Sequence, residues 1–138
     1  MTKVELFQMM NENMAFHLAT SEDGQPHVRG MLLFRADEDG IIFHTGEFKD
    51  LYRQLTNNAK VELCFNSPTL QVRVTGEVEQ LHDKKLVEEI YAHPTRQFMR
   101  NWKEQGIDAK LAVFRVKNGV ATTWSMATNF EKKEYINL

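Results

Sequence analysis

The sequence contains one cysteine, Cys64, and no apolar run of the length that a transmembrane helix or a signal peptide needs. A single cysteine excludes an internal disulfide, and a lone thiol is typical of a reducing compartment. A membrane-spanning helix takes about 18 consecutive apolar residues, whereas the first residues of this chain already include Lys3 and Glu5. These absences predict a cytoplasmic protein that does not associate with a membrane.

A surplus of positive charge is also absent, because 17 Lys and Arg residues stand against 19 Asp and Glu residues, for a net charge of −2. General nucleic-acid-binding proteins usually carry a basic excess, so we expect no nucleic-acid partner. The five histidines have no metal-ligand spacing, and no metal site is expected. The sequence shows no Ser-His-Asp set and no pair of carboxylates with convincing catalytic spacing.

The composition is that of a globular domain. The 138 residues are 42% apolar and 26% charged, and a chain of this length buries roughly two thirds of its unfolded surface. No linker, internal repeat or low-complexity segment divides the sequence. We therefore expect one domain over residues 1–138.

Strand-like alternation and turn signals dominate the chain. Strands are predicted over residues 14–20, 27–36, 41–45, 60–65, 70–81, 110–117 and 120–126. Helical spacing is confined to residues 3–12, 48–57 and 83–105, the last divided at Pro94. Asp23-Gly24 and Asn118-Gly119 indicate tight hairpin turns, and Gly76 indicates a bulge or a close backbone approach.

Most of the predicted strands follow one another through short turns, which favours sequential antiparallel pairing, with the first three strands as a meander. The predicted fold class is mainly β: a closed antiparallel barrel of six or seven strands with helices packed outside it. An open α+β sheet is the alternative architecture.

Residues 27–49 combine two strands with the start of a helix, and this unit carries two cations. Arg29 lies near the start of the first strand, and Lys49 lies where the helix begins. Two cations and the free N–H groups of a helix N-terminus can together hold a phosphate. The stretch therefore predicts a phosphate site between Arg29 and Lys49.

Four motifs in order along the chain support a family resemblance: Arg29-Gly30-Met31-Leu32, Phe43-His44-Thr45, Lys49, and the strand from Gln71 to Val78. Over residues 5–126 the chain resembles the pyridoxamine 5'-phosphate oxidase-like family of FMN-binding split barrels. The last segment, with its Thr123-Trp124-Ser125-Met126 end, resembles the smaller general-stress-protein and nitroimidazole-resistance-like branch.

The resemblance implies a homodimer with FMN bound at the subunit interface. It implies that Arg29 and Lys49 hold the phosphate and that strand residues surround the flavin ring. These ring contacts are Gly30, Met31, Leu32, His44, Thr45 and Gln71, with Trp124 stacking near the ring across the interface. Trp102 is a weaker candidate for covering the substrate side. In such a site the flavin carries the hydride chemistry, and the protein supplies binding and orientation.

The sequence also departs from the family pattern. Glu47 and Phe48 precede Lys49 where the oxidases usually have Ser-Arg-Lys or Ser-x-Lys, and a carboxylate beside a phosphate is repulsive unless Glu47 points away. The Arg-x-x-x-Arg-like segment with which true pyridoxamine phosphate oxidases bind substrate is not found after Trp124. Vitamin B6 oxidation itself is therefore not expected.

The expected function is an FMN-dependent oxidoreductase that passes hydride or electrons from a reduced nicotinamide or flavin to a small acceptor, such as a nitroaromatic or a quinone. Three alternatives remain. The chain could be a non-catalytic flavin-binding or flavin-storage module, a haem-binding relative with His44 or a nearby histidine as axial ligand, or a protein that uses deazaflavin.

Overall fold

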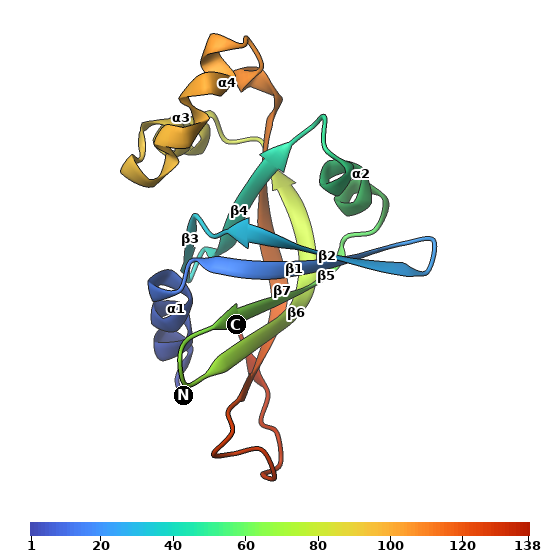
Figure 1. Cartoon of the computed structure of the whole chain (residues 1–138), viewed down its shortest axis with the longest axis vertical. Helices are drawn as coiled ribbons and strands as arrows, with labels where there is room; N and C mark the ends of the chain where they lie inside the picture. The colour runs from blue at the N-terminus through green and yellow to red at the C-terminus, as the bar shows by residue number, and fades with distance from the viewer.

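Eight strands form one antiparallel sheet in the computed structural model, which describes residues 1–138 (Figure 1). The strands are β1 Ala15–Glu22, β2 Gln25–Leu32, β3 Arg35–Asp37, β4 Gly40–Gly46, β5 Lys60–Asn66, β6 Gln71–Leu81, β7 Leu111–Trp124 and β8 Ile136–Asn137. The helices are α1 Lys3–Glu12, α2 Asp50–Asn57, α3 Lys84–Ala92 and α4 Arg100–Glu104, with 3-10 turns η1 Pro94–Met99 and η2 Asp108–Lys110. The predicted mainly β barrel with outer helices is confirmed. The strands number eight, because β3 is separate from β2 and β8 is additional, while the two strands expected over 110–117 and 120–126 are one, β7.

The two end strands of the sheet, β2 and β3, are consecutive in the chain, so the sheet must curl to bring them close together. The strand order is β2-β1-β5-β6-β7-β4-β3, with β8 beside β7. Between β2 and β3 the chain turns a corner at Leu33 and Phe34. The Leu33 N–H donates to the Met14 carbonyl at 2.8 Å, and the Phe34 N–H donates to the Ile42 carbonyl at 2.9 Å. The corner therefore bonds to both sides of the barrel.

This corner corrects two predictions. The strand expected over 27–36 is two strands, β2 and β3, because the chain must bend for Leu33 and Ala36 to be buried in one interior. The expected meander is confirmed for β1 with β2 and, at the end of the strand expected over 27–36, for β3 with β4, but β2 itself does not pair with β4, whose other neighbour is β7.

The two predicted hairpin turns have different outcomes. Asp23 and Gly24 both have positive φ, 52° and 79°, as a two-residue turn between β1 and β2 requires. The hairpin at Asn118 is wrong, because β7 continues through that position. Asn118, at φ 54°, and its neighbour Gly119 form a bulge opposite Gly76. A Cβ on Gly76 would lie 2.9 Å from the Lys117 carbonyl, so the predicted close approach is confirmed.

One apolar cluster of 22 buried residues fills the barrel and extends under α1 and α2. The sequence begins α1 with a capping box, in which the Glu5 N–H donates to Thr2 Oγ1 at 3.1 Å and the Thr2 N–H donates to Glu5 at 2.6 Å. The side-chain amide of Asn11 bonds to both backbone groups of Ala36 and so joins α1 to β3.

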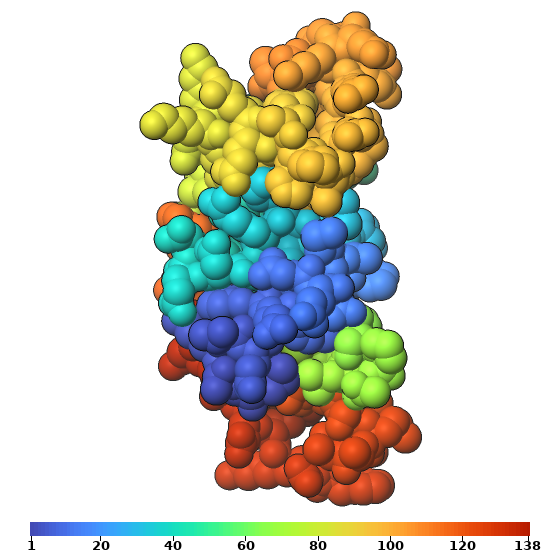
Figure 2. Space-filling model, turned by 90° about the vertical axis from the view of Figure 1, so that its left-hand side faces the viewer, coloured from blue at the N-terminus to red at the C-terminus, as the bar shows by residue number.

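Residues 82–110 form an insertion between β6 and β7 that contains α3, η1, α4 and η2. Pro94 ends α3, as predicted, because it cannot continue the helix. A second cluster of seven buried residues lies beneath this insertion. Figure 2 shows the insertion, in yellow and orange, and the segment after β7, in red, at opposite ends of an elongated molecule.

The residues after Trp124 leave the sheet and then return to it. β8 pairs with β7 at Val120 and Ala121, and the Thr122 hydroxyl donates to the Glu134 carbonyl at 2.8 Å. None of the helices combines the length and apolarity needed to cross a bilayer.

Candidate functional site

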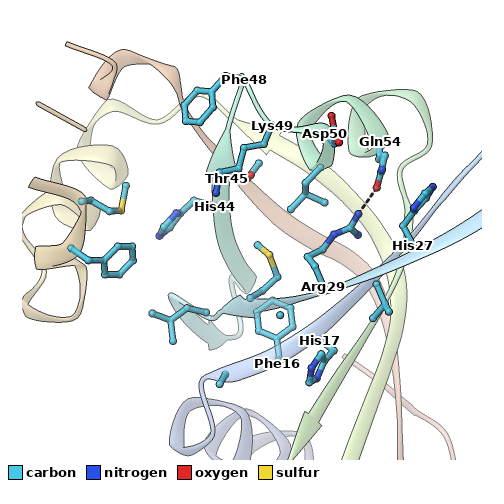
Figure 3. Close-up of a pocket in the computed structure, with 18 of the residues that line it drawn as sticks. Phe16, His17, His27, Arg29, His44, Thr45, Phe48, Lys49, Asp50 and Gln54 are labelled. Atoms are coloured by element: carbon cyan, nitrogen blue, oxygen red, sulfur yellow. Dashed lines mark hydrogen bonds between the residues drawn. The ribbon is translucent and has the colours of Figure 1, made fainter. Parts of the chain in front are cut away.

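A cavity of about 1060 Å³ opens between β2, β4, the start of α2 and the η1–α4 part of the insertion (Figure 3). Seven of the nine residues predicted to contact the cofactor line it: Arg29, Gly30, Met31, Leu32, His44, Thr45 and Lys49. They meet there because β2 and β4 approach each other from different parts of the barrel. A Cβ added to Gly30 would touch nothing within 4 Å, so the space above this glycine is open.

Arg29 is held at the cavity by neutral acceptors only. Its Nη1 donates to Thr20 Oγ1 at 2.8 Å and to the Leu18 carbonyl at 3.3 Å, and its Nη2 donates to Gln54 Oε1. The Thr20 hydroxyl donates to the same Gln54 oxygen at 2.6 Å, and both side chains are buried. Partial burial lowers the pKa of Arg29 but leaves it charged at neutral pH. No carboxylate neutralises the guanidinium.

Lys49 stands at the N-cap position of α2 and also lines the cavity, with its side chain directed toward Thr45 and His44 (Figure 3). Its side chain makes no capping bond and takes part in none of the ion pairs of the structure. Asp50 also lines the cavity, but its carboxylate is paired with Arg53 at 3.0 Å. Glu47 is exposed and is not part of the lining. The cavity lining therefore carries two cations, Arg29 and Lys49, that have no ion-pair partner.

The insertion provides an apolar wall. Phe48 and Trp102 pack with ring centroids 5.4 Å apart, and Phe98 and Met99 lie beside them in the lining. Gly46 permits this contact, because a Cβ there would lie 2.7 Å from the Phe48 ring and 3.1 Å from Trp102. Phe48 and Phe98 are 52% and 60% exposed at the mouth. The cavity lining thus combines cations with aromatic surface.

His44 lies on β4 at the insertion side of the cavity. Its Nε2 accepts a hydrogen bond of 2.8 Å from Nε of Arg96, a residue of η1 that is only 1% exposed. Burial, followed by the charges of Arg96 and Lys49, lowers the pKa of His44 to about 4. His44 is therefore a neutral imidazole at physiological pH.

Gln71 and Trp124, the other two predicted contacts, lie elsewhere. They face each other across β6 and β7 and line a smaller hollow with the loop after β5. β7 begins at Leu111, which pairs with Gly46 next to the lining residue Thr45, and Trp124 lies 13 residues further on, roughly 40 Å along the strand. One copy of the chain does not bring these two residues to the cavity.

The family profile described as pyridoxamine 5'-phosphate oxidase matches residues 3–125. The chain belongs to this family. A pyridoxine/pyridoxamine 5'-phosphate oxidase of Shewanella woodyi is 33% identical over 101 residues, which make up 71% of this chain and 47% of that protein. The chain thus spans about half the length of the curated relatives it matches.

Solved structures with the same fold have lower identity. A NimC/NimA family protein of Clostridium acetobutylicum has a TM-score of 0.77 at 24% identity, over 98% of this chain and 92% of the other. An FAD-binding protein of Mesorhizobium loti has a TM-score of 0.69 at 17% identity, over 91% and 96%. A pyridoxamine 5'-phosphate oxidase-related, FMN binding protein of Nostoc punctiforme has a TM-score of 0.64 at 14% identity, over 99% and 95%. The family resemblance that the motifs indicated is confirmed.

Three buried residues around the site were not found from the sequence: Thr20, Gln54 and Arg96. Thr20 lies in an ordinary strand pattern and Gln54 in an ordinary amphipathic helix. Arg96 follows Pro94 in a segment that resembles a solvated helix start. Only the tertiary contacts of these residues with Arg29 and His44 separate them from other polar residues of the chain. Trp102, the weaker candidate, does line the cavity.

Proposed function

We propose that this member of the pyridoxamine 5'-phosphate oxidase family binds FMN in the cavity and acts as a cytoplasmic oxidoreductase. The observation that carries the proposal is the pair of cations without an ion-pair partner, Arg29 and Lys49, in a cavity that also has an aromatic surface. A phosphate monoester joined to a flat ring system has matching chemistry. The printed description of the Nostoc punctiforme protein as FMN binding agrees with this choice.

Different residues of the cavity lining bind different parts of FMN in this proposal. Arg29 donates hydrogen bonds to the phosphate while Thr20 and Gln54 hold its guanidinium in position. Lys49 adds a second charge, and the uncapped N-terminus of α2 adds its dipole. Met31, Leu32 and Thr45 line the strand side of the cavity, and Phe98 and Trp102 exclude water from the other side. When bound, FMN supplies hydride transfer from a reduced nicotinamide or flavin to a small acceptor, such as a quinone or nitroaromatic.

We also propose a homodimer, because Gln71 and Trp124 contact the cofactor only if a second copy presents them. Their hollow shares no lining residue with the cavity of the same chain, and Trp124 is held there by a 2.9 Å bond from its indole nitrogen to Asn129. The alternative that His44 ligates haem has less support, because Arg96 occupies the Nε2 lone pair. A storage module and a deazaflavin protein remain as alternatives that experiment separates.

The experiment compares the affinities of FMN and riboflavin, which differ only in the phosphate. We expect the wild-type protein to bind FMN at least tenfold more tightly than riboflavin, and Lys49→Ala to remove most of that difference. Lys85→Ala, at an exposed position on α3, is the matched control. Equal affinity for the two ligands in the wild type would contradict the phosphate site.

Reduction of the bound flavin separates an enzyme from a storage module. An oxidoreductase bleaches the flavin absorbance when NADH or NADPH is added without oxygen, and a following pulse of quinone restores it. A storage module stays oxidised with either nucleotide. Size-exclusion chromatography with light scattering tests the homodimer in the same samples.

A further inference from the structure

Arg96 is an unusual arginine because it is buried without a carboxylate. Its Nη2 donates to the carbonyls of Leu33 at 2.8 Å and Leu32 at 3.3 Å, and its Nη1 donates to Thr95 Oγ1 at 3.0 Å. Its guanidinium also lies 5.4 Å from the centroid of the Phe34 ring. The Leu32 and Leu33 carbonyls lie at the corner between β2 and β3, where the ladder is interrupted, so Arg96 satisfies groups that strand pairing does not.

The remaining bond of Arg96 goes to His44 and determines where the imidazole carries its proton. Guanidinium Nε can only donate, so the Nε2 of His44, 2.8 Å away, must be the unprotonated nitrogen. A neutral imidazole with a bare Nε2 has its proton on Nδ1. That Nδ1 has no partner in the chain, although His44 lines the cavity.

The surroundings of His44 keep it neutral. Arg96 from η1 and Lys49 from the start of α2 are the charges that act on the ring, and both are cations. On the neighbouring strand, the residue opposite His44 is Val113. A protonated imidazole would be placed against two positive charges in a partly buried site.

Two carboxylates on the adjacent helices, Asp50 and Glu89, are engaged by arginines. Asp50 of α2 pairs with Arg53 at 3.0 Å, and Glu89 of α3 pairs with Arg35 at 2.9 Å. The second imidazole of the insertion, His93, bonds through Nδ1 with Thr95 at 2.7 Å. None of these groups offers His44 an acceptor that would favour its charged form.

We infer that Arg96 is a positioning residue that holds His44 as the Nδ1–H tautomer, and that this N–H donates to an oxygen of the small electron acceptor. The second half of the inference rests on the proposed function. The donor sits beside the aromatic wall of Phe98 and Trp102, so the site fits a flat acceptor with an uncharged oxygen, of the quinone or nitroaromatic class.

The donor acts on charge that forms during reduction. When a quinone takes a hydride from the reduced cofactor, the cofactor is oxidised and one quinone oxygen gains the electron pair as an oxyanion. Water then supplies the proton that completes the hydroquinone. A fixed N–H polarised by the Arg96 cation stabilises that oxyanion without giving up its own proton.

The first test needs neither flavin nor turnover. In protein with ¹⁵N-labelled histidine, the imidazole signals missing from His44→Gln identify His44, and we expect protonated Nδ1 and bare Nε2 from pH 8 to 5. In Arg96→Met the ring should show mixed tautomers and titrate closer to the ordinary range, whereas Arg96→Lys should retain part of the preference. Arg100→Met, at an exposed position of the same insertion, is the control. A wild-type ring protonated on Nε2 would overturn the inference even if no Arg96 variant folds.

The second test separates the two ring nitrogens. An Asn side chain can place its amide near the Nδ1 position and a Gln side chain near the Nε2 position, so His44→Asn keeps a donor into the cavity whereas His44→Gln keeps only the acceptor for Arg96. With a water-soluble 1,4-naphthoquinone and FMN at saturation for each variant, His44→Gln should lower kcat/KM about five- to tenfold and His44→Asn clearly less. Equal loss in both variants would refute the donor role. Failure of the wild type to bind FMN would instead refute the proposed function and leave the tautomer result intact.

Discussion

Replacing Gln54 by Glu introduces one negative charge behind Arg29 with almost no change of shape. In the wild type, the neutral Gln54 oxygen accepts from Arg29 and from Thr20, and its side chain is 4% exposed. A carboxylate at this position forms a buried ion pair with Arg29. Of the two cations of the cavity lining, Arg29 is then neutralised and Lys49 alone keeps its net positive charge.

The expected loss of FMN affinity follows from Coulomb's law. At an effective dielectric constant of about 20 and a separation of roughly 6 Å, a unit negative charge and one phosphate charge repel each other by about 2.8 kcal/mol. This corresponds to about a 100-fold loss, and screening through the open mouth of the cavity reduces it toward about tenfold. Riboflavin, which lacks the phosphate, should bind Gln54→Glu as it binds the wild type.

The assay is a fluorescence titration of both flavins against wild type, Gln54→Glu and the control Gln8→Glu, which adds the same charge on the exposed side of α1. FMN affinity should fall by about ten- to 100-fold in Gln54→Glu alone, and the fall should shrink at high salt. Unchanged FMN affinity in folded Gln54→Glu would show that the phosphate does not lie against Arg29. An equal loss for riboflavin would assign the effect to distortion of the cavity.

Three further predictions concern stability. The pKa of His44 is lowered from 6.5 in the unfolded chain to about 4 in the fold, so the unfolded state binds a proton at a higher pH than the folded state. The free energy of unfolding should therefore fall as pH drops from about 6.5 to 4, by up to about 3 kcal/mol. Urea titrations of His44→Gln should show a smaller dependence on pH. Gly76→Ala places a Cβ 2.9 Å from the Lys117 carbonyl and should cost about 1–3 kcal/mol of unfolding free energy; an unaffected urea midpoint would contradict the close approach. Thr2→Ala removes the capping bond of α1 and should cost about 1 kcal/mol; a matching loss in Thr69→Ala, in an exposed loop, would argue against a specific cap.

The sequence was sufficient for the elements but not for how they pair. Periodicity located nearly every helix and strand because it reflects burial of one face, as Leu63 and Phe65 in β5 illustrate. It could not show that the strand over 27–36 bends at Leu33, since the apolar pattern continues unbroken across the corner. Asn118-Gly119 misled because a bulge and a hairpin turn both use a residue with positive φ.

The site was predictable where it depends on charge and short motifs. Arg29 and Lys49 came from their place on a strand and at a helix start, and His44 from the strand motif around it. Their partners, Gln54 and Arg96, lie 25 and 52 residues away in the chain, and nothing local indicates these contacts. Whether Gln71 and Trp124 contact a cofactor is still a prediction, because that contact depends on a second copy.

The corner at Leu33 and Phe34 joins the two end strands of the sheet, β2 and β3, through the chain itself. Leu33 is fully buried and Phe34 is 8% exposed, so neither a protease nor the solvent reaches this peptide while β2 and β3 keep their places. Amide exchange or cleavage at this corner would therefore report opening of the whole barrel, whereas the ends of the chain report only fraying. Because Arg96 donates hydrogen bonds to the Leu32 and Leu33 carbonyls, it stabilises this corner. The side chain that orients His44 thus also bonds to the corner, so opening of the barrel there would release His44 as well.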